Sequence, residues 1–195
     1  MIQDIYPHIY NNTFDPGVKP SNDDIIFSFE EDQVLMKDEH QFYHYHDISK
    51  ESVCYYLFSI DNIKFFLADL TSLNHIKVSF RKMRTFEDQM LGFAAITAWH
   101  LYRWIQDNKY CGKCGHPMDF DKKERAMRCP HCSNIVYPKI SPAVIVGITN
   151  DKGQILVTKY AHGHYQSYAL VAGYYEIGET IEETVKREVK EETGL

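Results

Sequence analysis

Residues 173–195, which read GYYEIGETIEETVKREVKEETGL, carry the most specific pattern in this chain of 195 residues. They fit the spacing G-x5-E-x7-R-E-U-x-E-E-x-G-U, in which U is a bulky aliphatic residue. Seven positions of the pattern require one residue type. Each such type makes up roughly 5–8% of an ordinary sequence, so a match by chance is very improbable. The residues that fill the pattern are Gly173, Glu179, Arg187, Glu188, Val189, Glu191, Glu192, Gly194 and Leu195.

The second half of this stretch predicts a helix over residues 181–193. Thr180 and Glu183 have the spacing of a capping box, in which each side chain accepts a hydrogen bond from the backbone of the other residue. Gly194 is a natural C-terminal cap, because glycine adopts the left-handed backbone conformation without steric cost. Local sequence signals therefore delimit the helix at both ends.

Two glutamates of this helix predict a metal site. At about 100° per residue, the aliphatic side chains share one face, and Glu192 points into the middle of that face with Glu188 beside it. Carboxylates four residues apart repel each other, and a carboxylate aimed at a core without a partner is costly. Mg²⁺ or Mn²⁺ resolves both problems, because these ions prefer carboxylate oxygens. Glu191 flanks the pair, where it can bind a further ion or handle a nucleophilic water. The alternative is an acidic, solvated helix. The aliphatic residues are Ile181, Val185 and Val189.

Four cysteines predict a structural zinc site. They form two C-x2-C pairs separated by fourteen residues, which is the layout of a zinc ribbon. Four thiolates leave no open coordination position, so this zinc is expected to stabilise the fold and not to act in catalysis. His116 and His131 are alternative ligands, although either would break the symmetry of the pairs. The predicted ligands are Cys111, Cys114, Cys129 and Cys132.

The composition predicts a cytoplasmic protein without a membrane span. Hydrophobic residues make up 44% of the sequence, and the net charge is -6 at pH 7. No signal peptide is evident at the N-terminus, and no apolar run approaches the roughly eighteen residues of a transmembrane helix. The acidic balance argues against broad attraction to nucleic acid, so a polyanionic substrate needs a local site with metal cations. The fifth cysteine, Cys54, lies in an apolar run and is interpreted as a small buried hydrophobic residue.

Residues 1–84 are predicted to form a β-rich N-terminal domain. Asp61 and Asn62 indicate a two-residue hairpin turn between two apolar runs, because both residue types tolerate positive φ. His44 and His46 raise the alternative of a histidine metal site, although strand or surface histidines are commoner. The predicted strands cover residues 25–29, 53–60, 63–68 and 76–78.

An amphipathic helix is predicted to follow, over residues 85–108. Thr85 and Asp88 resemble a capping box at its start. Apolar residues recur every three or four positions, so one face of the helix is expected to pack against a neighbouring domain or a second subunit. These residues are Met90, Ala94, Ala98, Leu101 and Ile105.

A third segment begins near Ser141. Residues 143–146 predict an apolar strand, residues 150–153 a turn, and residues 155–157 the returning strand. Residues 168–171 then lead into the pattern described above.

The spacing of residues 173–195 is that of the Nudix box, so this segment resembles the Nudix hydrolases, enzymes that cleave a diphosphate linked to a nucleoside. The preceding cysteine ribbon, the joint YPKISP at 137–142 and the sequence VAGY at 171–174 are similar to the NADH pyrophosphatase subfamily. The resemblance covers residues 85–195. It implies an α+β chain with a β-rich N-terminal domain (1–84), a linking helix (85–108), a zinc ribbon (109–138) and the N-terminal half of a Nudix α/β/α sandwich (139–195).

The resemblance implies metal-dependent hydrolysis of the diphosphate of NADH or NAD⁺, which yields nicotinamide mononucleotide and AMP, and by extension removal of an NAD cap from RNA. It also implies a homodimer. One alternative is a Nudix hydrolase of another dinucleotide, such as ADP-ribose. The other is a non-catalytic zinc-ribbon module that binds nucleic acid or a protein partner, since basic side chains cluster locally in the ribbon.

Individual roles also follow from the resemblance. Glu188, Glu192 and the carbonyl group of Ala172 are expected to hold the catalytic Mg²⁺ or Mn²⁺, with Glu191 assisting. Tyr174 stands where the subfamily commonly has a phenylalanine that stacks on the nicotinamide.

Other positions are expected to support the box or touch the substrate. Arg187 is expected to orient the box through Glu179. Tyr137 is a candidate nucleotide contact across a dimer interface, and Arg81 is a candidate phosphate contact. The two box glycines are Gly173 and Gly194.

Members of the subfamily continue past the box through an S-Q-P-W-P-F-P-like segment and a further metal-binding glutamate. Neither follows Leu195 in the sequence given. We therefore expect a chain that carries about half of a Nudix domain, as a fragment or with a partner that supplies the remainder, and that is compromised in activity by itself. Turnover of NADH by a version extended past Leu195, but not by this chain, would confirm that expectation.

Overall fold

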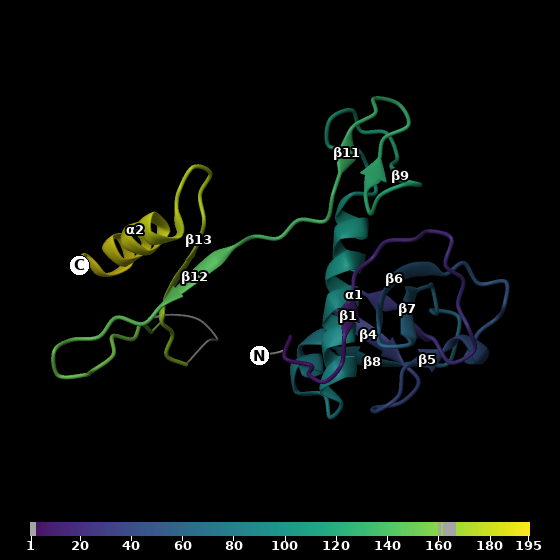
Figure 1. The fold of residues 1–195 in the computed structure, drawn as a ribbon, viewed down its shortest axis with the longest axis horizontal. Coiled ribbons are helices and arrows are strands. Elements are labelled where there is room, and N and C mark those ends of the chain that lie inside the picture. The colour runs from purple at the N-terminus through teal and green to yellow at the C-terminus, as the bar shows by residue number, and fades with distance from the viewer. Residues whose placement is uncertain (1–2, 160, 162–166) are drawn as a thin grey trace. The chain divides into compact units, whose positions relative to one another are not determined.

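The computed structural model describes residues 3–159, 161 and 167–195, and the chain forms two compact units, Met1–Pro138 and Lys139–Leu195. The chain combines helices with several separate sheets, which confirms the predicted α+β class (Figure 1). No helix among these residues has both the length and the apolar character that crossing a membrane requires.

A five-stranded sheet in the order β1-β6-β7-β2-β5 forms one part of the first unit. β6 and β7 are an antiparallel hairpin in which Ile60 pairs with Ile63. Asp61 has a φ of 52°, so the predicted two-residue turn is confirmed. β2 runs parallel to β7, which fixes a long-range pairing that no local turn specifies. The strands are β1 (Tyr10–Asn11), β2 (Ile25–Phe27), β5 (Tyr43–His44), β6 (Tyr55–Ile60) and β7 (Ile63–Leu67).

A smaller sheet in the order β3-β4-β8 and the long helix α1 (Gln89–Asp107) complete the N-terminal part. The small residues Ala94 and Ala98 of α1 are fully buried in the same hydrophobic cluster as Phe27, Phe58 and Phe65. Because alanine side chains are small, the aromatic rings of the sheet can pack closely against this face of the helix. The strands are β3 (Phe29–Glu30), β4 (Gln33–Met36) and β8 (Ile76–Ser79).

The start of α1 differs from the prediction. Asp88 caps the helix, and its carboxylate accepts a hydrogen bond from the backbone N–H of Leu91 at 3.0 Å. Thr85 instead ends the short 3₁₀ helix η2 (Phe80–Thr85), where its hydroxyl donates to the carbonyl of Lys82 at 3.3 Å. The predicted capping box at Thr85 is therefore wrong, because the aspartate three residues later provides the cap itself.

The second unit contains a two-stranded sheet and one helix. β12 (Ala143–Val146) pairs antiparallel with β13 (Val171–Tyr174) over four residues. The expected return at 155–157 is present without forming a regular strand: an isolated antiparallel bridge joins Thr149 to Ile155, and the backbone N–H of Leu156 donates to the carbonyl of Ile148 at 2.8 Å. β12 pairs instead with β13, which lies much later in the sequence.

Helix α2 (Ile181–Thr193) confirms the predicted boundaries. Thr180 and Glu183 form the reciprocal capping box, and Gly194 adopts the left-handed conformation with a φ of 77°. α2 packs against β12 and β13, with the side chain of Thr184 fully buried.

Candidate metal centres

The four predicted cysteines converge in the first unit. All four Sγ atoms lie within 4.8 Å of one another, with 3.6 Å between Cys111 and Cys132 and 3.5 Å between Cys114 and Cys129. A tetrahedral ion with Zn–S bonds of about 2.3 Å separates its sulfurs by roughly 3.8 Å, so the four side chains fit zinc. The surrounding strands are β9 (Asp119–Phe120), β10 (Met127–Arg128) and β11 (Ile135–Val136).

A backbone donor favours the thiolate form of Cys129. The backbone N–H of Cys132 lies 3.5 Å from Cys129 Sγ, and that hydrogen bond lowers the pKa of the Cys129 thiol. Asn134 Nδ2 donates to Cys111 Sγ at 3.7 Å. A zinc ion requires deprotonated cysteines, so these donors belong to the chemistry of the site.

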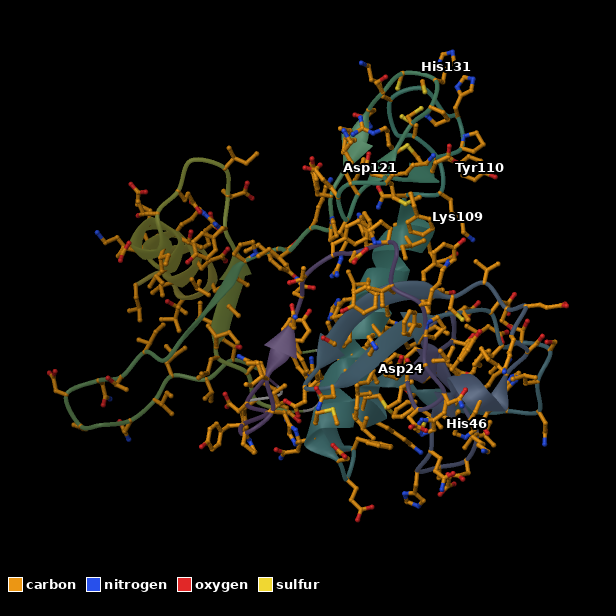
Figure 2. The ribbon with its side chains drawn as sticks, turned by 45° about the vertical axis from the view of Figure 1, so that its right-hand side comes forward. Asp24, His46, Lys109, Tyr110, Asp121 and His131 are labelled. Atoms are coloured by element: carbon orange, nitrogen blue, oxygen red, sulfur yellow. The ribbon has the colours of Figure 1, made fainter. Side chains whose placement is uncertain are left out.

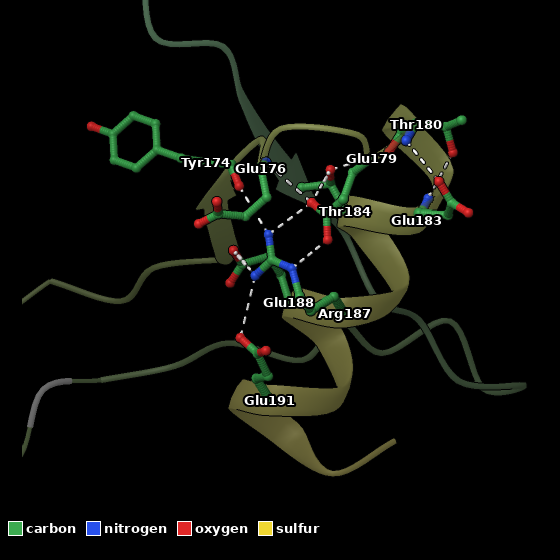
Figure 3. A network of polar contacts seen from close by, with 9 residues as sticks. All are labelled: Tyr174, Glu176, Glu179, Thr180, Glu183, Thr184, Arg187, Glu188 and Glu191. Atoms are coloured by element: carbon green, nitrogen blue, oxygen red, sulfur yellow. Dashed lines mark hydrogen bonds and ion pairs between the residues drawn. The ribbon is translucent and has the colours of Figure 1, made fainter.

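Arg187 is the centre of a polar network in the second unit (Figure 3). Its Nε donates to Glu179 Oε1 at 2.6 Å and its Nη2 to Glu179 Oε2 at 3.0 Å, a bidentate pair. Its Nη1 reaches Glu188 Oε1 at 2.7 Å and Glu191 Oε2 at 3.3 Å, and Nη2 also donates to the carbonyl of Tyr174 at 3.0 Å. One guanidinium thus joins α2, the loop before it and the end of β13.

Glu179 is held by more than the arginine. Its Oε2 also accepts from the Thr184 hydroxyl at 2.9 Å and from the backbone N–H of Glu176 at 3.2 Å. The hydrogen bonds from Arg187, followed by those from Thr184 and Glu176, lower the pKa of Glu179 to about 2 even though desolvation opposes them. The carboxylate is therefore ionised at neutral pH with its acceptor capacity in use.

Glu188 lies directly against Gly173. A Cβ atom at Gly173 would lie 1.9 Å from both Cδ and Oε1 of Glu188, a separation that atoms do not tolerate. The Glu188 side chain is 12% exposed, and Oε1 is engaged by Arg187. Among the described residues, no group donates a hydrogen bond to Oε2. A half-buried carboxylate with one oxygen fixed and the other available fits a divalent cation.

The orientation of the helix differs in part from the prediction. Glu192 is exposed and makes no hydrogen bond or ion pair with another described residue, and Ile181 is 56% exposed. The side of α2 that meets the sheet instead carries Thr184 and Glu188. The anchoring of Arg187 and Thr184 to Glu179 sets this rotation, which the aliphatic pattern alone does not reveal.

The predicted substrate contacts are exposed. Tyr174 is 66% exposed on β13, as a stacking ring requires. Tyr137 belongs to the first unit, where its hydroxyl donates to Glu124 Oε2 at 2.5 Å. Arg81 lies exposed in η2, also in the first unit. The roles of these residues, and those of Ala172, Glu191 and Glu192, remain predictions.

Two other sequence features have structural interpretations. His44 and His46 each place Nδ1 at 2.9 Å from a backbone carbonyl oxygen, and they belong to no metal-ligand cluster found among the described residues. Cys54 is half-buried against an apolar cluster, and burial raises the pKa of its thiol.

Two segments of the chain match known protein families. Residues 139–195 match the family described as NUDIX domain, and residues 106–137 match the NADH pyrophosphatase zinc ribbon domain. The chain contains a zinc ribbon and a Nudix domain. The Nudix match includes the network around Arg187, and the ribbon match includes all four cysteines.

Curated relatives extend the similarity. An NAD-capped RNA hydrolase NudC of Klebsiella pneumoniae subsp. pneumoniae is 42% identical over 95 residues, which are 49% of this chain and 37% of that protein. Proteins of the same name from Salmonella typhi and Salmonella typhimurium are 36% identical over 125 residues, 63% of this chain and 48% of theirs. The chain therefore spans less than half the length of the curated relatives it matches.

Thr184 is a site residue that the sequence analysis missed. It is not part of the box pattern, and a threonine inside a helix usually bonds only to the carbonyl four residues earlier. The available signal was its spacing, since Thr184 stands five residues after Glu179 and three before Arg187.

Proposed function

We propose that this protein hydrolyses the diphosphate of NADH or NAD⁺, including an NAD cap on RNA, with Mg²⁺ or Mn²⁺ as cofactor. The observation that carries the proposal is Glu188, which Arg187 and the absence of a side chain at Gly173 hold with one carboxylate oxygen available. The names of the relatives support the NAD class, and the ribbon matches a family described as NADH pyrophosphatase.

The residues of the chain have separable tasks in this proposal. Glu188 and Glu192, with the carbonyl of Ala172, hold the metal, and Arg187 fixes the position of Glu188. Bound Mg²⁺ or Mn²⁺ supplies charge neutralisation of the diphosphate and acidification of water. Glu191 Oε2 lies 3.3 Å from Arg187 Nη1 and its side chain is exposed, so this carboxylate can accept a proton from the attacking water.

Tyr174 is the proposed ring for base stacking. Its side chain is exposed while its carbonyl is fixed by Arg187, so the same arginine positions the metal-binding helix and the strand that presents the ring. A planar nicotinamide or adenine can stack on a tyrosine ring. Tyr137 and Arg81 are further proposed contacts to the nucleotide and phosphate.

The test is product analysis with matched variants. A version of the chain extended past Leu195 is incubated with NADH and Mn²⁺ or Mg²⁺ beside the chain itself, and nicotinamide mononucleotide and AMP are separated by chromatography. We expect both products in equal amounts, with loss of at least about 100-fold in rate for Glu188→Gln or Glu192→Gln. Glu182→Gln is the control, because Glu182 is exposed on the same helix and outside the network.

Two outcomes would overturn the proposal. The first is no AMP from the extended version although it demonstrably binds Mn²⁺; the second is equal rates for the control and the two carboxylate variants of that version. Parallel reactions with ADP-ribose and with NAD-capped RNA decide the substrate class, since a faster rate on ADP-ribose favours the other Nudix assignment.

The proposal also includes a cellular location, an oligomeric state and a division of the chain into segments. A site of four thiolates suits a reducing compartment, so we place the protein in the cytoplasm. We also propose a homodimer, which light scattering on the purified protein tests directly. The boundaries 1–84, 85–108, 109–138 and 139–195 remain our proposed division into functional segments.

A further inference from the structure

Two histidines of the zinc ribbon stand face to face. The rings of His116 and His131 are 3.8 Å apart between centroids and only 3° from parallel. Both side chains are exposed, and each comes from one of the two cysteine turns: His116 follows Cys114 by two residues, and His131 directly precedes Cys132. The view in Figure 2 shows His131 at the tip of the ribbon. The ribbon turns thus present two imidazoles outward as well as four thiolates inward.

The hydrogen bonding of His116 prepares it as a ligand. Its Nδ1 lies 3.2 Å from the backbone carbonyl oxygen of Cys114, and a carbonyl can only accept, so Nδ1 carries the proton. The lone pair is then on Nε2. Metal-binding histidines commonly have this arrangement, in which the non-ligating nitrogen donates to a carbonyl or carboxylate. No hydrogen bond joins the imidazole of His131 to another described residue, so either of its ring nitrogens is available.

A third donor atom completes the cluster. Cys114 Sγ and one ring nitrogen each from His116 and His131 lie within 4.8 Å of one another. We propose that these three side chains form a second metal site on the outer side of the ribbon, for a borderline-soft divalent ion such as Zn²⁺, Co²⁺ or Ni²⁺. Imidazole and thiolate are the ligand types that select such ions over Mg²⁺.

The second site must share Cys114 with the ribbon zinc. A thiolate sulfur retains lone pairs after binding one ion, so Cys114 bridges the two metals. The parallel rings have to tilt, because an ion lies in the plane of each imidazole that binds it. Since both rings are exposed, this movement displaces no packed side chain. Three protein ligands leave one tetrahedral position for water or an external ligand, unlike the closed four-cysteine site.

The test counts metal ions on the purified chain. Equilibrium dialysis against increasing Zn²⁺, with excess Mg²⁺ to occupy the carboxylate site proposed on α2, measures the number of ions bound per chain and their affinities. We expect one tightly bound ion per chain and a second, weaker one. His116→Ala or His131→Ala is expected to weaken the second ion by at least about tenfold and to keep the first. Retention of the first ion also shows that the ribbon of the variant is folded.

His40→Ala is the matched control, because His40 is an exposed histidine of the same unit outside the ribbon. Three results would overturn the proposal. They are a single bound ion in the unmodified chain, loss of the tight ion in the histidine variants, which would make a histidine a ligand of the ribbon zinc, and an equal effect of His40→Ala. Tilting of the rings gives an independent readout, since the histidine ¹⁵N resonances of both rings should shift with the second equivalent of Zn²⁺ and not with the first.

Discussion

At the scale of single residues, two neighbours determine the position of the Glu188 carboxylate. They are Gly173, which has no side chain, and Arg187. Gly173 leaves the space in which the carboxylate lies, and Arg187 supplies the opposite charge at 2.7 Å. Burying a carboxylate to 12% exposure is costly without such a partner. The two residues act together, because the arginine fixes one oxygen while the glycine determines where the whole group can be.

Gly173→Ala should displace Glu188. The added Cβ would lie 1.9 Å from two atoms of the carboxyl group, so either the side chain leaves its place or β13 moves away from α2. We expect Mn²⁺ binding, followed by electron paramagnetic resonance, to weaken at least about tenfold, with a stability loss of roughly 1–3 kcal/mol from overpacking. Gly147→Ala is the control, because its Cβ would meet only Ile155 Cδ1 at 3.8 Å. Equal Mn²⁺ affinity in both variants would contradict this account.

Thr184 should act through its hydroxyl. The single proton can go to Glu179 Oε2 at 2.9 Å or to the Thr180 carbonyl at 3.1 Å, and the charged acceptor is the stronger one. Thr184→Val removes the donor at nearly constant shape, so the pKa of Glu179 should rise, as measured by ¹³C NMR of its carboxyl group. The free energy of unfolding should decrease by roughly 1–3 kcal/mol. Thr184→Ser keeps the hydroxyl and should preserve the low pKa. If valine and serine variants have the same Glu179 pKa, the hydroxyl has no such role.

At the scale of elements, the predictable features are those with local causes. The ends of α2 follow from Thr180, Glu183 and Gly194, all within one turn of the helix termini, and the turn at Asp61 follows from its neighbours. Pairing between distant segments is not local: β12 finds β13 about 25 residues later in the chain, which residues 155–157 could not reveal. The strands β1 and β5 are not predicted, since two residues in each leave no readable period, and β4 is not predicted either.

The rotation of α2 about its axis is also a feature that the local sequence pattern does not predict. An apolar stripe predicts which face is buried only when packing is mainly apolar. Here a charged network ties the helix to the loop before it, and Thr184 is buried while Ile181 is exposed. The carboxylates proposed to bind metal could be predicted from spacing, and the pairing of Arg187 with Glu179 from the family resemblance. The close contact of Gly173 with Glu188 could not, because it is a tertiary contact between β13 and α2.

The junction between α2 and its preceding loop should weaken in acid. The folded pKa of Glu179 is about 2 and its ordinary value is 4.5, so its stabilising contribution is complete above about pH 4.5 and is lost as the pH falls toward 2. Amide hydrogen exchange of residues 176–187 should therefore accelerate across this range relative to a reference peptide. Glu179→Gln should remove that pH dependence, whereas Glu182→Gln, at an exposed position on the same helix, should keep it. An unchanged profile in Glu179→Gln would contradict the prediction.

At the scale of the whole molecule, the predicted zinc ligands make up much of the small core of the ribbon. Its buried cluster consists of Cys111, Cys129 and two methionines, with the remaining cysteines packed beside them. Arg125 links the ribbon to the N-terminal sheet through Asn12 Oδ1 at 2.5 Å and the carbonyl of Leu57. Since metal ligands form half of that core, zinc binding contributes directly to folding here.

Zinc removal should loosen the ribbon and leave the N-terminal sheets folded. The two tryptophans of the chain report on these parts separately: Trp104 packs against the ribbon cluster, whereas Trp99 stacks on Phe80 at 3.9 Å. The Trp99→Phe variant keeps Trp104 as its single tryptophan. In this variant a strong zinc chelator should shift the fluorescence emission to longer wavelength, because the indole ring of Trp104 becomes exposed to water. In Trp104→Phe, the same treatment should leave the Trp99 emission unchanged, because the cluster around Phe27 and Phe65 contains no metal ligand. A red shift of both tryptophans would mean that the ribbon and the N-terminal sheets unfold as one cooperative unit, and a shift of neither would mean that zinc does not maintain the ribbon.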